Sequence, residues 1–192
     1  MRPETHLQPG FVSSPVSTPN NQARAAPAER QFDAIYAEFF PFVWRCLRGL
    51  GVPEPLLDDA AQDVFVVVHR RLPEFRERSS VRTWLYGILR NIASNQRRGA
   101  ARRRAEPLED ELPSRAPGPH ERAEEAEAAA FVQRFLHEVD SKRREVFILA
   151  LLEEMSVPEV AAALSIPLNT AYTRLRLVRA DFQKALAVEL GT

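Results

Sequence analysis

The sequence predicts an all-α fold of two small helical domains, and three observations support this. Apolar residues recur at spacings of three and four through most of the chain, and helix-capping residues stand where these segments begin. Residues 105–127 are acidic, contain four prolines and lack apolar periodicity, which predicts a flexible Pro-rich linker. We therefore expect helical domains over residues 31–104 and 128–190.

The chain is predicted to begin with a tail, followed by a first core helix. Residues 1–30 are rich in Pro, Ala and Ser and lack a hydrophobic run, which predicts a disordered tail rather than a signal peptide or a membrane span. Core positions start at Phe32 and include Tyr36, and Pro41 predicts a break or a new start in this helix. Residues 49–53 are predicted to end this helix. Cys46, the single cysteine, lies in its apolar run and is expected to be buried.

A second helix is predicted over residues 56–72, with valines and alanines facing inward. Its first half concentrates the polar side chains of Asp58, Asp59, Gln62 and Asp63, where negative charge also favours the helix dipole. An acidic face does not bind DNA. The residues alone leave two interpretations open, which are dipole compensation and a docking face for a basic protein partner.

The third predicted helix lies within residues 75–104, which carry nine arginines against a single acid, although the whole chain has no net charge. Ser79 or Ser80 can cap this helix. Arginine binds phosphate with two parallel hydrogen bonds and stacks on bases, so an arginine-rich face favours a nucleic-acid strand over a merely solvated surface. An apolar stripe is expected to be buried on the other side. The polar arc consists of Arg82, Tyr86, Arg90 and Arg97, with Asn91 nearby.

The last third of the chain predicts a helix-turn-helix. Ser156 and Glu159 have the spacing of a capping box, and residues 165–167 end the helix that follows. Ser165 occupies a turn position that favours glycine and a positive φ. Asn169 is expected to cap the second helix. Polar and basic groups face away from the apolar stripe of this helix, which suits contacts in the DNA major groove, although paired helices also occur in other helical domains.

In their order, these segments resemble the sigma-70 family of RNA polymerase sigma factors, and most closely its small extracytoplasmic-function group. The resemblance covers residues 32–98 and 131–186, which correspond to the sigma-2 and sigma-4 domains of the family. The segments that carry it are Gln62-Asp63-Val64-Phe65, Phe75-Arg76, SSVRTWLYGILRN at residues 79–91 and IPLNTAYTRL at residues 166–175.

The resemblance implies a role for each set of polar residues. Docking on core RNA polymerase is implied for Asp59, Gln62 and Asp63. Recognition and melting of the minus-10 element, including capture of a flipped base, is implied for Arg76, Arg78, Ser79, Ser80, Arg82, Arg90, Asn91, Arg97 and Arg98. Recognition of the minus-35 element is implied for Asn169, Thr170, Tyr172, Thr173, Arg174, Arg176 and Arg179.

The implied partners are core RNA polymerase, promoter DNA and an anti-sigma factor, in the cytoplasm and without membrane insertion. The residues disfavour an enzyme, because the four histidines are scattered and no glycine-rich phosphate loop occurs. We expect no cofactor, metal or small-molecule substrate. The rival hypothesis is an autonomous helix-turn-helix regulator that binds an operator as a dimer. A third, weaker one is a helical protein that only sequesters a partner.

Overall fold

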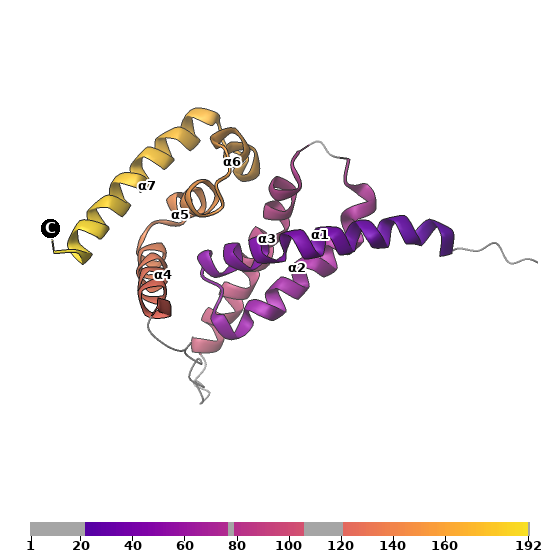
Figure 1. The fold of residues 1–192 in the computed structure, drawn as a ribbon, viewed down its shortest axis with the longest axis horizontal. Coiled ribbons are helices and arrows are strands. Elements are labelled where there is room, and N and C mark those ends of the chain that lie inside the picture. Colours follow the sequence, from indigo (N-terminus) through magenta and orange to yellow (C-terminus); the bar gives the residue numbers. More distant parts are fainter. Residues whose placement is uncertain (1–21, 77–78, 106–120, 192) are drawn as a thin grey trace, which may run out of the picture.

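The computed structural model describes residues 22–76, 79–105 and 121–191, and all regular structure within these ranges is helical, which confirms the all-α class (Figure 1). The helices form two units, α1 to α3 and α4 to α7, which we call the N-terminal and C-terminal units. Their elements are α1 (Gln22–Gly49), η1 (Glu54–Leu56), α2 (Leu57–Arg71), η2 (Leu72–Glu74), α3 (Val81–Ala105), α4 (Glu121–Glu138), α5 (Ser141–Phe147), the π-helical turn η3 (Ile148–Leu152), α6 (Val157–Leu164) and α7 (Leu168–Glu189).

The three helices of the N-terminal unit all pack against one another. Fully buried aliphatic side chains from each helix, such as Val43, Val64 and Leu85, meet between them. Cys46 is also fully buried, as expected, and burial raises the pKa of its thiol well above the ordinary value. Helix α1 extends beyond the other two at its N-terminal end (Figure 1).

Two expectations for α1 are wrong. The helix already begins at Gln22, so residues 22–30 of the expected tail are helical, while residues 1–21 lie outside the described residues. The helix also continues through Pro41 without a break. Pro41 is exposed and its neighbours Phe42 and Val43 are buried, so the packing of these neighbours outweighs the hydrogen bond that proline cannot donate.

The C-terminal unit is built around a cluster of phenylalanines. The rings of Phe135, Phe147 and Phe182 come from three different helices, and their centroids lie 5.0 to 5.1 Å apart. Helix α4 begins at Glu121, so the last part of the expected linker over residues 105–127 is helical, and residues 106–120 lie outside the described ranges.

The two units share one continuous apolar core. Helix α3 packs directly against α6, and α1 contacts η3. Gly49 at the end of α1 is buried beneath Ile148, where a Cβ atom would lie 2.9 Å from Cδ1 of that isoleucine. The linker is therefore not the only connection between the units, because a packed interface also joins them.

Candidate nucleic-acid and protein interfaces

The three residues predicted for polymerase docking form one exposed polar face on α2. Asp59, Gln62 and Asp63 are spaced by three and four residues, and all three side chains are exposed. Asp63 accepts a hydrogen bond from Gln96 Nε2 of α3 at 3.4 Å. Next to them, Asp58 accepts one from Trp44 Nε1 of α1 at 3.2 Å. Both bonds tie the acidic end of α2 to its neighbouring helices.

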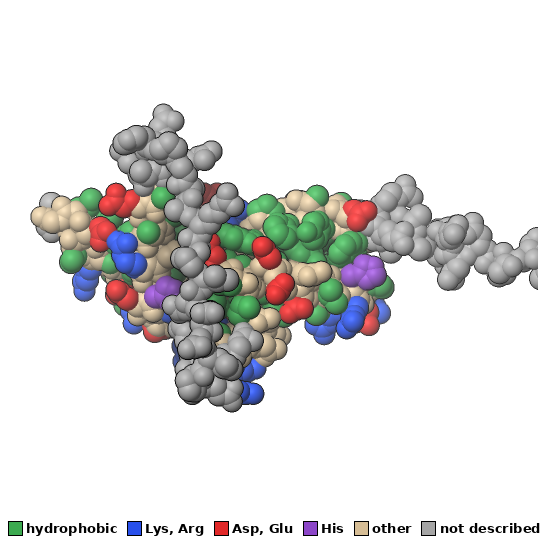
Figure 2. Space-filling view, turned by 90° about the horizontal axis from the view of Figure 1, so that it is seen from below, with side chains coloured by type: hydrophobic (Ala, Val, Ile, Leu, Met, Phe, Trp, Pro, Cys, Tyr) green, Lys and Arg blue, Asp and Glu red, His purple; other side chains and the backbone are tan. Residues whose placement is uncertain are grey.

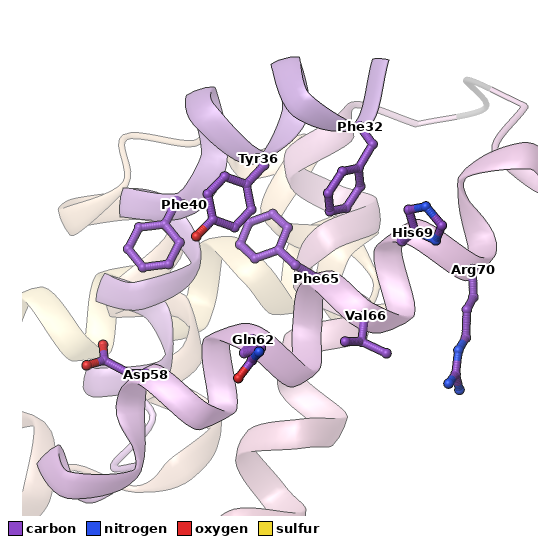
Figure 3. A pocket seen from close by; sticks show the side chains of 9 residues that line it. All are labelled: Phe32, Tyr36, Phe40, Asp58, Gln62, Phe65, Val66, His69 and Arg70. Carbon is purple, nitrogen blue, oxygen red and sulfur yellow. The ribbon is translucent and has the colours of Figure 1, made fainter. Parts of the chain in front are cut away.

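Beside this acidic face lies an aromatic groove of about 550 Å³. Figure 3 shows that Phe32, Tyr36 and Phe40 of α1 gather around Phe65 of α2. The centroid of the Tyr36 ring is 4.6 Å from that of Phe65, and the Phe40 and Phe65 rings stack at 6.1 Å. Asp58, Gln62 and Arg70 are among the polar residues that border the groove.

The groove leaves apolar side chains on the surface. Tyr36, expected to be a core residue, is 43% exposed, and Val66 of α2 has the same exposed fraction. Figure 2 shows the apolar surface of this region beside acidic groups. Sequence reasoning missed the groove, although Phe32, Tyr36 and Phe40 recur every four residues and therefore share one face of α1. An apolar patch of this kind is typical of a protein interaction site.

A second hollow lies before α3 and contains part of the set predicted for minus-10 DNA. Its lining consists of Glu74, Phe75, Arg76, Ser79 and Trp84, and the rings of the two aromatic residues are 4.7 Å apart. Ser80 caps α3, because its hydroxyl oxygen accepts the Thr83 N–H at 3.3 Å. Arg78 lies outside the described residues.

Tyr86 does not belong to the polar arc of α3. Its side chain is fully buried, its hydroxyl has no hydrogen-bond partner among the described residues, and burial raises its pKa well above the ordinary value. The expectation was wrong because α3 packs against helices of both units: it contacts α1 and α2 of its own unit and α6 of the other. More of its circumference is therefore buried than a single apolar stripe predicts.

Two arginines of α3 donate hydrogen bonds to the C-terminal unit. Arg82 Nη1 donates a hydrogen bond to the backbone oxygen of Glu153 at 3.0 Å, and Arg90 Nε donates to Glu145 Oε1 at 2.6 Å. Both acceptors belong to the C-terminal unit. The remaining residues of the set on α3, which are Asn91, Arg97 and Arg98, lie on the distal half of the helix and are exposed, as are Arg82 and Arg90 themselves.

The helix-turn-helix forms with the expected capping box. The Ser156 N–H donates a hydrogen bond to Glu159 Oε2 at 3.0 Å, and the Glu159 N–H donates one to Ser156 Oγ at 3.4 Å. Ser165 ends α6 with φ of 54°, the positive value that its turn position predicts. The expected cap at Asn169 is wrong. Pro167, with φ of −59°, occupies the cap position and its carbonyl accepts the N–H groups of residues 170 and 171, so Asn169 already lies in the first turn of α7.

The polar face of α7 is separated from its buried stripe as predicted. Ala171, Leu175 and Val178 are buried against the rest of the C-terminal unit. Thr173 donates its hydroxyl hydrogen to the backbone oxygen of Asn169 at 2.9 Å. Thr170 and Arg174 are half-buried at the border. The residues of the predicted set that are exposed are Asn169, Tyr172, Thr173, Arg176 and Arg179.

Within residues 22–76, 79–105 and 121–191, no group of three or more His, Cys, Asp or Glu side chains is placed to hold a metal ion. No helix in these ranges is both long enough and apolar enough to span a bilayer.

Comparison with known families gives two matches, one in each unit. Residues 35–103 match the family described as Sigma-70 region 2, and residues 132–182 match the family described as Sigma-70, region 4. The first range lies in the N-terminal unit, with the acidic face and the arginines of α3. The second lies in the C-terminal unit and includes most of α7.

Individual proteins are also similar to this chain. The RNA polymerase sigma factor NccH of Alcaligenes xylosoxydans xylosoxydans is 33% identical over 144 residues, which cover 72% of this chain and 77% of NccH. The ECF RNA polymerase sigma factor SigM of Mycobacterium tuberculosis is 26% identical over 164 residues, covering 85% of this chain and 81% of SigM. The solved structure of CnrH in complex with the cytosolic domain of CnrY superimposes with a TM-score of 0.65 at 27% identity, covering 85% of this chain and 95% of that one; CnrH is an RNA polymerase sigma factor of Cupriavidus metallidurans.

Proposed function

Because this chain belongs to the sigma-70 family as an extracytoplasmic-function sigma factor, we propose that it binds core RNA polymerase and directs it to promoters read at two elements. The observation that carries this proposal is the pair of separate polar surfaces, one on α3 and one on α7, each in a range that matches a different sigma-70 region. We propose residues 31–104 and 128–190 as the two functional domains.

Core polymerase docks on the acidic face of α2 in this proposal. The exposed side chains of Asp59, Gln62 and Asp63 are complementary to basic groups on a partner. The adjacent aromatic groove offers apolar area, which supplies binding free energy that exposed charges alone do not. A partner surface with basic residues beside an apolar side chain fits this combination.

The hollow before α3 and the exposed half of α3 hold the opened minus-10 strand. Extruding a base costs a few kcal/mol, which stacking and pocket contacts must offset. The neighbouring rings of Phe75 and Trp84 provide a surface for stacking, and Arg76 and Ser79 provide hydrogen-bond donors beside it. Arg97 and Arg98 on the exposed face of α3 then contact phosphates further along the strand.

Helix α7 reads the minus-35 element in the major groove. Its first two turns expose Asn169, Tyr172 and Thr173, and Arg176 and Arg179 follow on the same side. Amide and hydroxyl groups suit base edges, whereas arginine suits guanine and phosphate. The exposed apolar surface of Tyr172 fits contact with a thymine methyl group.

An anti-sigma factor is the remaining partner that we propose. The similar protein CnrH was solved with the cytosolic domain of CnrY bound to it, which supports a protein partner of that kind for this chain. A protein with this function works in the cytoplasm, where core RNA polymerase is found, and requires no cofactor or catalytic residue of its own.

Run-off transcription with purified core enzyme tests the proposal. Specific RNA that appears only when this protein is added supports a sigma factor. Sequence-specific DNA binding by the isolated protein, without any transcript, would instead favour the autonomous helix-turn-helix regulator.

Two paired variants test the assignment of surfaces. Asp59→Arg with Asp63→Arg is expected to abolish binding to core enzyme, whereas Arg174→Ala with Arg176→Ala leaves that binding intact and weakens use of promoters that depend on minus-35. Each removed arginine contact to a base costs about 1–3 kcal/mol. If both pairs reduced core binding equally, the assignment of core docking to α2 and of minus-35 recognition to α7 would be contradicted.

A further inference from the structure

The first two turns of α7 carry apolar surface on the side proposed to read DNA. Tyr172 is 53% exposed, and Leu168, one turn before it, is 44% exposed. Because these residues are four positions apart, their side chains lie next to each other on the helix surface. In a helix-turn-helix, the N-terminal residues of the second helix contact base edges. The part of α7 expected to meet bases is therefore partly apolar.

Thr173 adds a methyl group to this surface. Its hydroxyl donates a hydrogen bond to the backbone oxygen of Asn169 at 2.9 Å. A hydroxyl has a single hydrogen, so Thr173 cannot donate to a base acceptor while this bond is in place. The exposed side chain is left with its methyl group and its oxygen lone pairs.

Positive charge follows on the same side of α7. Arg176 lies four residues after Tyr172 and three after Thr173, Arg179 lies three further on, and both arginines are exposed. Within the described part of the chain, neither arginine takes part in an ion pair. A polyanion fits this face better than an apolar protein surface, which would bury two arginines without a counter-charge.

Thymine is the base that matches apolar side chains in the major groove. It presents a 5-methyl group there, whereas cytosine presents an amine and lacks this methyl group. Threonine methyl groups and aromatic rings make apolar contacts with the thymine methyl. Burying one such group strengthens binding about fourfold.

We propose that Tyr172 and Thr173 each select a thymine of the minus-35 element through its 5-methyl group. The proposal rests on the proposed function, because it takes α7 to read that element. Asn169 is exposed one turn before Thr173, and its amide suits adenine. We therefore expect A·T pairs opposite all three side chains.

Deoxyuridine tests this proposal, because it pairs as thymine does and lacks only the 5-methyl group. Each thymine of the minus-35 element is replaced singly, on either strand of a promoter that the run-off assay has located. Competition binding then measures the promoter affinity of the holoenzyme formed by core enzyme and the full-length chain. We expect two positions at which the replacement weakens binding by about fourfold. If no replacement weakens binding, the proposal is overturned.

Two variants connect each methyl group to its side chain. Thr173→Ser keeps the hydroxyl and its bond to Asn169 but removes the methyl group, and Tyr172→Ala removes the ring. Each variant is expected to abolish the effect of deoxyuridine at one of the two positions and to keep it at the other. Effects of variant and base that add independently would overturn the assignment, because groups in contact are coupled.

Leu186→Ala is the matched control for these variants. It truncates an apolar side chain that is 37% exposed, several turns further along the same helix. The control is expected to keep both deoxyuridine effects in full. Loss of these effects in the control would contradict a local contact at Tyr172 and Thr173.

5-Methylcytosine separates the methyl group from the hydrogen-bonding groups of the base. At each of the two positions, a cytosine paired with guanine is expected to weaken binding, and 5-methylcytosine is expected to bind about fourfold more tightly than cytosine. Tighter binding to unmethylated cytosine than to thymine would mean that the Thr173 oxygen accepts a hydrogen bond from the amine. That result would overturn the proposal.

Failure of the proposed function can be told apart from failure of this inference. If core enzyme with the wild-type chain yields no transcript, the proposed function is contradicted, and the base replacements are then made in DNA selected by the isolated full-length chain. If the holoenzyme is active and Tyr172→Ala weakens binding to core enzyme without changing the response to deoxyuridine, the exposed ring belongs to a protein interface. In that case the selection of thymine by Tyr172 is overturned.

Discussion

Gly49 and Ile148 meet so closely that no side chain fits between them: a Cβ at Gly49 would lie 2.9 Å from Cδ1 of Ile148, which is itself fully buried. The contact joins the end of α1 to η3, and hence the two units. Gly49→Ala is expected to lower the thermal unfolding midpoint, because overpacking costs about 1–3 kcal/mol and exceeds the gain in helix propensity.

Gly87 provides the matched control for this prediction. It lies within α3, where an added Cβ would meet no atom within 4 Å. Gly87→Ala is therefore expected to raise the unfolding midpoint, since alanine is favoured over glycine in a helix by about 1 kcal/mol. A Gly49→Ala variant as stable as Gly87→Ala would contradict the close packing. Adding Ile148→Val to Gly49→Ala should recover part of the loss.

Removing the buried hydroxyl of Tyr86 is expected to cost no stability. The hydroxyl has no hydrogen-bond partner among the described residues, so Tyr86→Phe removes an unsatisfied polar group while keeping the ring. The free energy of unfolding, measured by urea denaturation, should stay equal or rise by up to about 1 kcal/mol. A loss of more than about 1 kcal/mol would show that the hydroxyl makes a stabilising bond.

The capping box of α6 predicts a pH dependence. Hydrogen bonds from the side chain and then the backbone of Ser156 hold the pKa of Glu159 below its ordinary value of 4.5. Because the folded-state pKa is lowered, the stabilisation is present above the unfolded pKa and is lost as the pH falls through the folded one. Ser156→Ala should therefore lower stability by about 1 kcal/mol at neutral pH, and by less in acid. A difference that is independent of pH would contradict the role of the carboxylate.

The aromatic groove is expected to contribute to the affinity for core polymerase. Tyr36→Ser/Val66→Ser removes exposed apolar surface, so it should weaken core binding by about tenfold or more while leaving the fold intact. Val188→Ser is the control, because Val188 is 81% exposed on the last turns of α7, away from the groove. Fluorescence anisotropy with labelled protein measures both affinities. Equal effects at the two sites would contradict a docking role for the groove.

Local signals in the sequence predicted local structure well. The capping box at Ser156, the positive φ at Ser165 and the cap at Ser80 all depend on residues within a few positions of each other, and all three are confirmed. The errors have a different origin. Pro41 remains helical and Tyr86 is buried because of packing between elements far apart in the chain, which periodicity within one helix does not report.

The interface between the N-terminal and C-terminal units could not be predicted for the same reason. Arg82 and Arg90 have the spacing of a nucleic-acid face, and nothing nearby in the sequence shows that their acceptors lie 71 and 55 residues away. Helix spacing could have found the aromatic groove of α1, but it does not tell whether another helix covers that face. The roles assigned to the DNA-facing residues remain predictions.

Permanganate footprinting tests the central claim most directly, because it detects unpaired thymines at a promoter that the run-off assay has located. With core enzyme present, we predict reactive thymines at the minus-10 region when the wild-type chain is added. We predict none with Arg97→Ala/Arg98→Ala, although that variant still binds core enzyme. Thymines that stay unreactive with the wild-type chain, or that open equally well without these arginines, would contradict the account.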